Sequence, residues 1–342
     1  MWGDGAPVKT LVISQREVPA LLPMGACVDL MAETLRTTSR GDAVLPLREM
    51  VWLPDRSGLL GLMPGYLGSP RALGLKVVSV MPGNHGTEYD SHQGVVILFE
   101  VTHGSLLAVI DATSITAIRT AAVSGAATRL LAREDAQDLA LLGSGVQART
   151  HLEAMAAVRP LRRVRVWSRD PSRARAFAER ESRRFDFTVE AVPDARAAVL
   201  GADMICTTTA SREPVLEGDW IAPGAHVNAV GACFAASREL DTRAVGRSRL
   251  YVDCRESALH EAGDFLIPRA EGAIGEDHIV GEIGEALLGK VPGRRSREEI
   301  TLFKSLGIAV EDLAAAHHIY RTALERGAGT AIELGGLRDP GA

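Results

Sequence analysis

The sequence predicts an α/β protein in which one domain is a parallel sheet covered by helices and the other is α+β. The first observation is a short apolar run, 139–142, that leads into Gly143, Gly145 and Ala148, with a helical pattern over 146–158. The second is the strand and helix alternation that continues from there, and the third is a series of short runs upstream, broken by Gly and Pro. An apolar strand, a G-x-G-x-x-A turn and a helix start are typical of a dinucleotide-binding βαβ unit, so the downstream part is predicted to be a Rossmann domain.

The upstream part of the chain predicts helices followed by a sheet. Residues 1 to about 12 lead into a strand, Ser14 and Glu17 have the spacing of a capping box, and a helical pattern over 24–40 is closed by Gly41. An alanine-rich stretch at 114–132 predicts a long helix that crosses to the next domain. Runs broken by Gly, Pro, Asp and Asn predict strands of an antiparallel or mixed sheet at 49–53, 59–63, 74–80, 94–100 and 106–110.

The downstream part predicts a parallel sheet with helices on both faces. Residues 289–298, with Pro292, Gly293 and three arginines, predict an exposed loop, and the tail from about residue 301, including 303–324, predicts a helix that returns to the first domain. We therefore expect residues 1–125 with 305–342 to form one domain and residues 126–304 to form the Rossmann domain. The predicted strands and helices follow one another at 138–143, 146–158, 163–168, 171–183, 187–192, 194–200, 203–207, 225–230 and 249–253.

Composition limits the classes of protein to which the chain can belong. Its 342 residues suffice for two domains with cores, and 46% apolar residues with a net charge of −5 give no bias toward nucleic acid or membrane. The N-terminus predicts no signal peptide, and no apolar run is long enough to span a bilayer. Four scattered cysteines predict reduced thiols in a cytoplasmic protein, with neither a metal site nor a disulfide framework.

The glycine turn and the strand after it predict the kind of cofactor. Gly143 permits a tight turn and Gly145 lets the backbone approach a pyrophosphate, which then lies at the N-terminus of the following helix. In NAD enzymes the second strand ends in an acidic residue that binds the ribose 2′-hydroxyl. Here Ser168 takes that position and Arg169 and Arg173 follow, which favours the 2′-phosphate of NADPH. Arginines that only solvate a helix start remain an alternative, and the neighbouring acid at position 170 leaves NADH possible.

Two later strands end in residues that suit a cofactor. Thr207 and Thr208 lie where the strand 203–207 ends, which is the edge at which open α/β sheets bind ligands. They are either hydrogen-bond partners of the cofactor or β-branched residues that run into a turn. His226 and Asn228, in the strand 225–230, are predicted to be structural.

Three cations of the first domain are candidates for chemistry: Arg48, Lys76 and Arg119. Lys76 interrupts an apolar run, and lysine is rarely buried without a partner, so its position requires a reason. An edge lysine that stays partly exposed is the alternative. Together the three cations could bind a carboxylate-bearing substrate, and a lysine beside two arginines has a lowered pKa, which suits proton transfer. His92, between a loop and a strand, is a further polar candidate.

Six stretches of the chain, in order from about residue 10 to residue 325, resemble the ornithine cyclodeaminase/μ-crystallin family. They are 45–50 (LPLREM), 91–93 (SHQ), 115–122 (ITAIRTAA), 143–148 (GSGVQA), 223–232 (PGAHVNAVGA) and 303–312 (FKSLGIAVED). The resemblance implies a homodimer whose subunits pair through the N-terminal, substrate-binding domain, and an NAD(P)-binding Rossmann domain in each subunit.

The resemblance also implies roles for particular residues. Arg48, Lys76 and Arg119 match the residues that bind the substrate carboxylate and handle its proton, and Ser91 and His92 match positions near the nicotinamide. Residues that match positions around the cofactor phosphates and the adenosine ribose are Ser144, Val146, Gln147, Ser168, Arg169 and Arg173. Further cofactor contacts are implied for Thr207, Thr208, Val230 and Ser305.

One departure separates the branches of this family. Cyclodeaminases carry G-A-D-x-P-G, and that Asp is their catalytic acid/base, whereas this chain has Cys233 at the position and lacks the Pro-Gly. A neutral thiol cannot replace a carboxylate that shuttles protons, so we expect a ketimine reductase similar to the μ-crystallin branch. The expected reaction is NADPH reduction of a cyclic ketimine acid, such as pyrroline-2-carboxylate or piperideine-2-carboxylate. Arg48 and Arg119 would hold the carboxylate, and Lys76 would orient the substrate or protonate the imine nitrogen.

Three alternatives remain from the sequence. A reductive aminase of the alanine dehydrogenase or N-alkyl amino-acid synthase type would take a 2-oxo acid and an amine with the same cofactor. An ornithine cyclodeaminase would use NAD without net consumption. A ligand-binding protein of the μ-crystallin kind would store NADPH or a small ligand without turnover, although 4% aromatic residues give little material for a large apolar cage.

Overall fold

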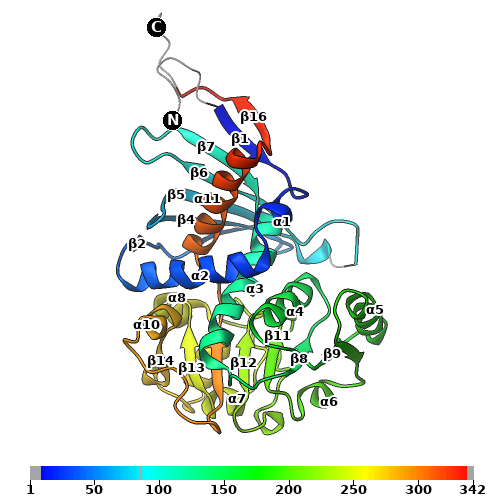
Figure 1. The fold of residues 1–342 in the computed structure, drawn as a ribbon. Coiled ribbons are helices and arrows are strands. Elements are labelled where there is room, and N and C mark those ends of the chain that lie inside the picture. Colours follow the sequence, from blue (N-terminus) through cyan, green and yellow to red (C-terminus); the bar gives the residue numbers. More distant parts are fainter. Residues whose placement is uncertain (1–8, 85, 337–342) are drawn as a thin grey trace, which may run out of the picture. The chain divides into compact units, whose positions relative to one another are not determined.

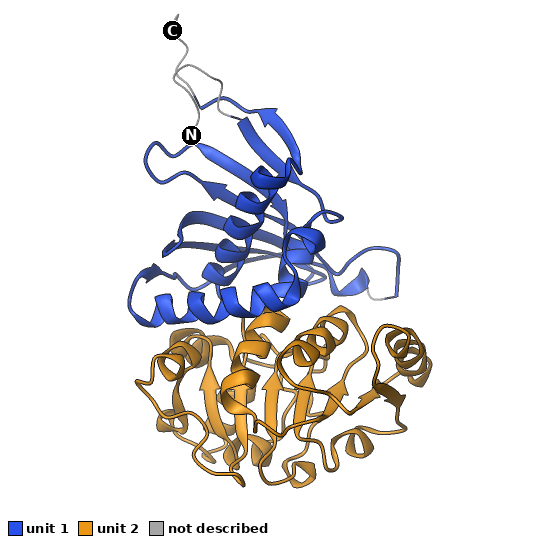
Figure 2. Cartoon of the chain, in the orientation of Figure 1, with its two compact units in different colours: residues 1–119, 308–342 blue, residues 120–307 orange. Residues whose placement is uncertain are grey.

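The computed structural model describes residues 9–84 and 86–336 of the chain (Figure 1). The chain forms two compact units, residues 1–119 with 308–342 and residues 120–307 (Figure 2). Helix α3 (Ala112–Leu131) begins in the first unit and ends in the second. Within the described residues, no helix has both the length and the apolar character that a membrane crossing requires.

The first unit is built on a mixed sheet whose strand order is β16-β1-β7-β6-β5-β4-β2, with β3 also paired to β4. Strands β1 and β7 are parallel, and the other neighbouring pairs are antiparallel. The strands are β1 (Lys9–Ile13), β2 (Ala43–Val44), β3 (Glu49–Trp52), β4 (Leu59–Gly68), β5 (Arg71–Val80), β6 (His92–Phe99), β7 (Leu106–Asp111) and β16 (Thr330–Glu333).

Helix α11 (Ala309–Arg326) packs on one face of this sheet and against α2 (Met24–Ser39), while α1 (Val18–Leu21) precedes α2 in the chain. Two glycines of the sheet allow the close approach of α11. A Cβ at Gly74 would come within 2.8 Å of Leu313 Cδ2, and one at Gly65 within 3.2 Å of Ala309 Cβ. The face of β4 and β5 that holds these glycines is therefore the face that α11 covers.

The second unit is a parallel sheet with the order β10-β9-β8-β11-β12-β15-β13-β14. Its strands are β8 (Asp138–Leu142), β9 (Arg163–Trp167), β10 (Thr188–Ala191), β11 (Met204–Thr207), β12 (His226–Ala229), β13 (Arg249–Val252), β14 (Ile279–Glu282) and β15 (Thr301–Lys304). Its helices after α3 are α4 (Val146–Val158), α5 (Pro171–Ser182), α6 (Ala195–Val199), α7 (Thr242–Gly246), α8 (Arg255–Glu261), α9 (Gly263–Ala270) and α10 (Ile283–Leu287). Every residue of β8, β11, β12 and β15 is buried, as expected for a parallel sheet covered on both faces.

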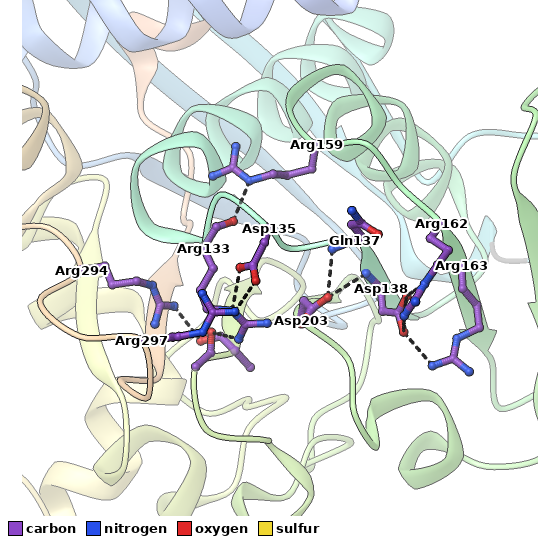
Figure 3. A network of polar contacts seen from close by, with 12 residues as sticks. Arg133, Asp135, Gln137, Asp138, Arg159, Arg162, Arg163, Asp203, Arg294 and Arg297 are labelled. Atoms are coloured by element: carbon purple, nitrogen blue, oxygen red, sulfur yellow. Dashed lines mark hydrogen bonds and ion pairs between the residues drawn. The ribbon is translucent and has the colours of Figure 1, made fainter.

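A network of arginines and acids lies at the amino ends of β8 and β11 (Figure 3). The Asp203 carboxylate pairs with Arg133 and accepts the N–H groups of Gln137 and Asp138 at 2.9 and 3.0 Å. The Arg159 guanidinium donates to carbonyls at the C-terminal end of α3, including that of Thr128 at 3.1 Å. These contacts fix the amino edge of the sheet, and the carboxyl edge is left for the residues with predicted functions.

The predicted fold class is confirmed, and one predicted element is wrong. The tail was expected to be helical from about residue 301, but Thr301–Lys304 is the strand β15, which lies between β12 and β13, and α11 begins at Ala309. A stretch of four residues such as TLFK is too short for its periodicity to distinguish a buried strand from a helix turn. Gly307, with φ 75°, separates the two elements. The predicted capping box is also displaced: Ser14 Oγ donates to Glu17 at 2.6 Å, but α1 begins only at Val18.

Candidate cofactor and substrate sites

The turn between β8 and α4 has the backbone geometry that a bound pyrophosphate requires. Gly143 has φ 119°, and its N–H donates to the carbonyl of Trp167 at 2.8 Å. A Cβ at Gly143 would lie 2.7 Å from Thr208 Oγ1, whereas a Cβ at Gly145 would meet no heavy atom within 4 Å. Only glycine therefore fits at position 143, and the open space beside Gly145 lets a ligand approach the backbone.

Helix α4 begins after Gly145 with no side-chain hydrogen bond to its cap and no acidic residue in its first turn. Ser144 and Gln147 are partly exposed beside it, and Val146 is 50% exposed. The N–H groups of the first turn and the helix dipole both favour an anion at this place. The turn and the helix start thus fit the phosphates of a dinucleotide.

The end of β9 has the residues that the sequence assigned to the adenosine ribose. Ser168 follows the strand and is partly exposed, and Arg169 and Arg173 are exposed. The Asp170 carboxylate caps α5 by accepting Ser172 N at 2.9 Å and Ser172 Oγ at 2.6 Å, and its other oxygen lies 3.6 Å from Arg173 Nε. Because Asp170 is engaged with its own helix, the strand end presents a serine and two arginines, which suits a 2′-phosphate.

The remaining predicted cofactor residues of this unit lie at the same edge of the sheet. Thr207 ends β11 and Thr208 follows it, Val230 follows β12, and Ser305 follows β15. Since β8, β11, β12 and β15 are parallel neighbours, their carboxyl ends share one edge. The Ser305 side chain is 1% exposed, and its Oγ has no hydrogen-bond partner among the described residues. A buried hydroxyl of this kind is suited to a bound ligand.

A buried glutamate that the sequence reasoning missed holds the loops of this edge. Glu239 accepts Thr207 Oγ1 at 2.8 Å, and it accepts Thr209 N, Thr209 Oγ1 and Gly231 N at 2.6 Å each. Burial raises the pKa of Glu239, and the neighbouring Asp264 raises it further. The Thr207 hydroxyl is therefore engaged with Glu239, and Glu239 joins the loop after β11 to the loop after β12.

Cys233 lies in the loop after β12 and is partly exposed. Its Sγ donates to the carbonyl of Val230 at 3.5 Å. Near it, the buried Lys304 ammonium lies 3.0 Å from Asp264 Oδ2. Burial lowers the pKa of Lys304, but Asp264, Cys233 and Glu239 raise it by more. The Cys233 thiol thus occupies the sequence position at which cyclodeaminases carry their catalytic carboxylate. The nearby Lys304 is paired with Asp264.

In the first unit, Lys76 of β5 and Arg119 of α3 meet two carboxylates from the first turn of α11. Lys76 Nζ lies 2.8 Å from Asp312 Oδ2, Arg119 Nε lies 2.9 Å from Asp312 Oδ1, and Arg119 Nη1 lies 2.7 Å from Glu311 Oε2. Lys76 and Arg119 are each 3% exposed, and both acids are fully buried. Lys76 is in a strand between β4 and β6 and on the covered face of the sheet, so it is not a partly exposed edge lysine.

The surroundings of Lys76 lower the pKa of its ammonium group. The pKa of Lys76 is lowered to about 8: burial lowers it most, Arg119 and Arg48 also lower it, and Asp312 opposes them. The direction agrees with the expectation from the sequence, but burial is a larger cause than the two arginines. Burial raises the pKa of Asp312, whereas Arg119 and Lys76 lower it by more, so this carboxyl is ionised.

The structure brings Arg48 to this cluster but places Ser91 and His92 elsewhere in the unit. Arg48 lies between β2 and β3, is partly exposed, and is near enough to Lys76 to affect its charge. His92 begins β6 opposite Val80, and Ser91 Oγ lies 3.0 Å from its Nδ1. Lys76 is paired with a residue four positions further along β6. The role of Ser91 and His92 near a nicotinamide stays a prediction.

Glu311 and Asp312 are two further functional candidates. They lie in the motif 303–312, but the sequence alone assigned them no role. Their signal was present, because two adjacent acids begin an otherwise apolar, alanine-rich helix segment, AVEDLAAA. Charged residues on a buried helix face need partners of opposite charge. The partners here lie on β5 and α3, and the structure is needed to identify them.

Comparison with known proteins agrees with this arrangement. Residues 8–327 match the ornithine cyclodeaminase/mu-crystallin family. The ketimine reductase mu-crystallin of Mus musculus is 42% identical over 280 residues, which cover 82% of this chain and 85% of that protein. A structure of Thermococcus litoralis Delta(1)-pyrroline-2-carboxylate reductase in complex with NADH and L-proline is 38% identical, with a TM-score of 0.92, and covers 94% of this chain and 100% of that chain. An archaeal alanine dehydrogenase dimer with bound NAD is 32% identical, with a TM-score of 0.90 and coverage of 95% and 99%.

Proposed function

The chain belongs to the ornithine cyclodeaminase/mu-crystallin family, and on that premise we propose that it reduces cyclic imines that carry a carboxylate on the imine carbon. It is an NAD(P)H-dependent oxidoreductase that acts on C=N bonds, and pyrroline-2-carboxylate and piperideine-2-carboxylate are its substrate class. The observation that supports this proposal best is the buried cluster of Lys76 and Arg119 with two carboxylates, together with the partly exposed Arg48 that lowers the pKa of Lys76. The guanidinium groups of this cluster suit a substrate carboxylate.

The cationic residues of the cluster have different roles in the proposed reaction. Arg48 and Arg119 bind the substrate carboxylate, since a guanidinium matches a carboxylate with two parallel hydrogen bonds. Lys76, with a pKa of about 8, holds a proton near neutral pH and gives it to the imine nitrogen, either directly or through water. A bound NAD(P)H supplies the hydride for the imine carbon. Lys76 lies on the face of the sheet that α11 covers and is therefore kept out of bulk water. Its proton can then pass to the imine nitrogen of a substrate whose carboxylate is already positioned.

The dinucleotide is held by residues of the second unit. We propose that the N–H groups at the start of α4 bind the pyrophosphate, and that Ser168, Arg169 and Arg173 prefer the 2′-phosphate of NADPH while NADH remains usable. The orphaned Ser305 hydroxyl and the open space at Gly145 support this placement. In this proposal residues 126–304 are the cofactor domain, and residues 1–125 with 305–342 are the domain for substrate binding and dimerisation.

A homodimer is proposed from the uncovered face of the first sheet. In the middle of β4, β5 and β6, the residues that alternate with those facing α11 are apolar and aligned across the strands, whereas Ser79 and Gln93 lie at one end of the same face. Leu60 and Leu73 on this face are 39% and 40% exposed. We take these three exposed or partly exposed apolar rows as the surface on which the second subunit packs. The rows are Leu62, Val77 and Val95; Pro64, Leu75, Ile97 and Val109; and Tyr66, Leu73, Phe99 and Leu106.

Reductive amination is the second candidate, because an alanine dehydrogenase shares 32% identity and the fold with this chain. The same cluster could bind the open-chain imine that a 2-oxo acid forms with an amine. A cyclodeaminase reaction is disfavoured, since Cys233 has no carboxylate to shuttle protons. The four cysteines are free thiols, which is consistent with the cytoplasmic location that we propose.

The test is NADPH absorbance with purified protein and four substrate sets. They are pyrroline-2-carboxylate, piperideine-2-carboxylate, pyruvate with methylamine, and ornithine with NAD. Rapid oxidation with the cyclic imines supports the proposal. Turnover only with pyruvate and methylamine would change the assignment to reductive amination, and proline with ammonia from ornithine would show a cyclodeaminase. Bound NADPH without turnover on any set would indicate a binding protein.

A further inference from the structure

The two oxygens of Asp312 join two groups that the proposed reaction uses for different purposes. Oδ1 accepts the Nε–H of Arg119 at 2.9 Å, and Oδ2 lies 2.8 Å from Lys76 Nζ. These partners come from different elements, α3 and β5, while Asp312 itself is in the first turn of α11. All three residues are at most 3% exposed, so the contacts are shielded from water and from salt.

We propose that Asp312 is a positioning residue for imine reduction, which holds the carboxylate-binding Arg119 and the proton-carrying Lys76 in one fixed arrangement. The proposal rests on the proposed function, because it takes Arg119 and Lys76 as the groups that bind and protonate the substrate. Asp312 acts through both cations. It therefore couples substrate binding to the availability of the proton.

The neighbouring helix residue shows that Asp312 is not needed merely as a negative charge near Arg119. Glu311 already pairs with Arg119 through Nη1 at 2.7 Å, and its carboxylate also accepts Ile308 N at 3.4 Å in the first turn of α11. Asp312 adds the contact with Lys76. Both acids contact Arg119, lie in the first turn of α11 and are fully buried. Variants of the two residues can therefore be compared directly.

Several charged or titratable groups lie next to Lys76 or next to its neighbours, and they influence the effect of removing Asp312. Asp312 and Glu311 are on α11, Arg119 is on α3, and Arg48 is in the segment before β3. Cys27 of α2 interacts with Arg119 and Glu311, and burial raises the pKa of its thiol, so it carries no charge. Burial, Arg119 and Arg48 all favour neutral Lys76, and Asp312 opposes them. Without Asp312 the lysine loses its proton at lower pH.

The alternative role for Asp312 is purely structural, as an ion pair that fixes α11 on the sheet. Such a role predicts a loss of stability with an unchanged pH dependence of the surviving activity. The positioning role predicts a displaced pH profile. The two roles are therefore separated by a measurement on folded protein.

The experiment compares Asp312→Asn with Glu311→Gln in the full chain, using pyrroline-2-carboxylate and NADPH. For Asp312→Asn we expect kcat to fall at neutral pH and the basic limb of the kcat profile to move about one pH unit or more toward lower pH. For Glu311→Gln we expect KM to rise by roughly tenfold, since one charged hydrogen bond to Arg119 is weakened, with the basic limb near its wild-type position. Equal limbs in both variants and in wild type would overturn the positioning role.

Two further measurements make the outcome decisive. If Asp312→Asn does not fold, Asp312→Glu replaces it, because this variant keeps the charge on a longer side chain. Asp312→Glu should lower kcat while the basic limb of the kcat profile stays near its wild-type position. A basic limb displaced toward lower pH in Asp312→Glu would overturn the proposal. Binding of the non-reducible probe pyrrole-2-carboxylate reports on Arg119 without turnover, and it should weaken in both Asp312→Asn and Glu311→Gln. If the wild type binds this probe and NADPH but does not oxidise NADPH, the proposed function fails and Asp312 is only a binding-site residue.

Discussion

The protonation of Lys76 gives the most specific prediction, and the perturbation is a change of pH from 7 to 10. Burial lowers the pKa of Lys76 to about 8, so the ammonium form is present below that value and is lost as the pH rises through it. Reduction needs the protonated lysine. The protonated fraction is about one tenth at pH 9 and about one hundredth at pH 10, and kcat should fall in the same proportion.

The reverse reaction needs the opposite form of the lysine. Oxidation of proline with NADP must remove a proton from the amine, so its kcat should rise with pH, with a midpoint at about pH 8, and level off roughly one pH unit above that midpoint. Both directions are measured at saturating cofactor and substrate by absorbance of the reduced nicotinamide. If the kcat–pH profiles of the two directions have opposite slopes and the same midpoint, a single group donates the proton in reduction and accepts it in oxidation.

Lys76→Arg is the control that assigns this midpoint. A guanidinium keeps its proton throughout this pH range, so the basic limb should disappear while kcat is lowered overall. Lys76→Ala should mainly lower kcat and leave the KM for the substrate less changed. If the basic limb persists in Lys76→Arg at the wild-type position, the limb belongs to the substrate or to another residue, and the proton-donor role of Lys76 is refuted.

Three other predictions test the remaining parts of the account. Arg48→Ala should raise KM for pyrroline-2-carboxylate by roughly ten- to a hundredfold with a smaller effect on kcat, since a hydrogen bond to a charged group contributes about 1.5–3 kcal/mol; steady-state kinetics in which kcat alone changes would contradict its role in binding. Ser168→Asp should reduce kcat/KM for NADPH by about tenfold or more and favour NADH, because a carboxylate repels the 2′-phosphate, and an unchanged ratio of the two cofactors would place the 2′-phosphate elsewhere. Leu75→Asp, in the middle row of the uncovered sheet face, should give a monomer in size-exclusion chromatography with light scattering, whereas an intact dimer would show that the subunits pair through another surface.

The sequence was sufficient to predict the elements whose periodicity is long or repeated. Helix α4 has the predicted bounds, Val146–Val158, because a glycine turn fixes its start and its apolar positions repeat over three turns. The carboxyl ends of β8, β9 and β11 carry the residues expected there, since a parallel βαβ order places those ends on one edge. The direction of the Lys76 pKa shift was also foreseen, from the two arginines expected beside it, although burial is the larger cause.

The sequence was insufficient where four residues make an element or where a contact joins distant segments. Strand β15 was expected to be helical, because Thr301–Lys304 is too short to show a period. Asp312 lies 193 residues from Arg119 along the chain, and nothing local indicates that the two side chains meet. The same limit applies to Glu239, whose four hydrogen bonds connect two loops of the sheet edge.

The central claim is that this chain reduces a C=N bond next to a carboxylate, and isotope transfer tests it most directly. The protein is incubated with pyrroline-2-carboxylate and NADPH that is dideuterated at C4, and the proline formed is analysed by mass spectrometry and NMR. We expect one deuterium on the Cα of proline and one NADPH oxidised for each proline made. Absence of proline, or proline without deuterium on Cα, would contradict the claim.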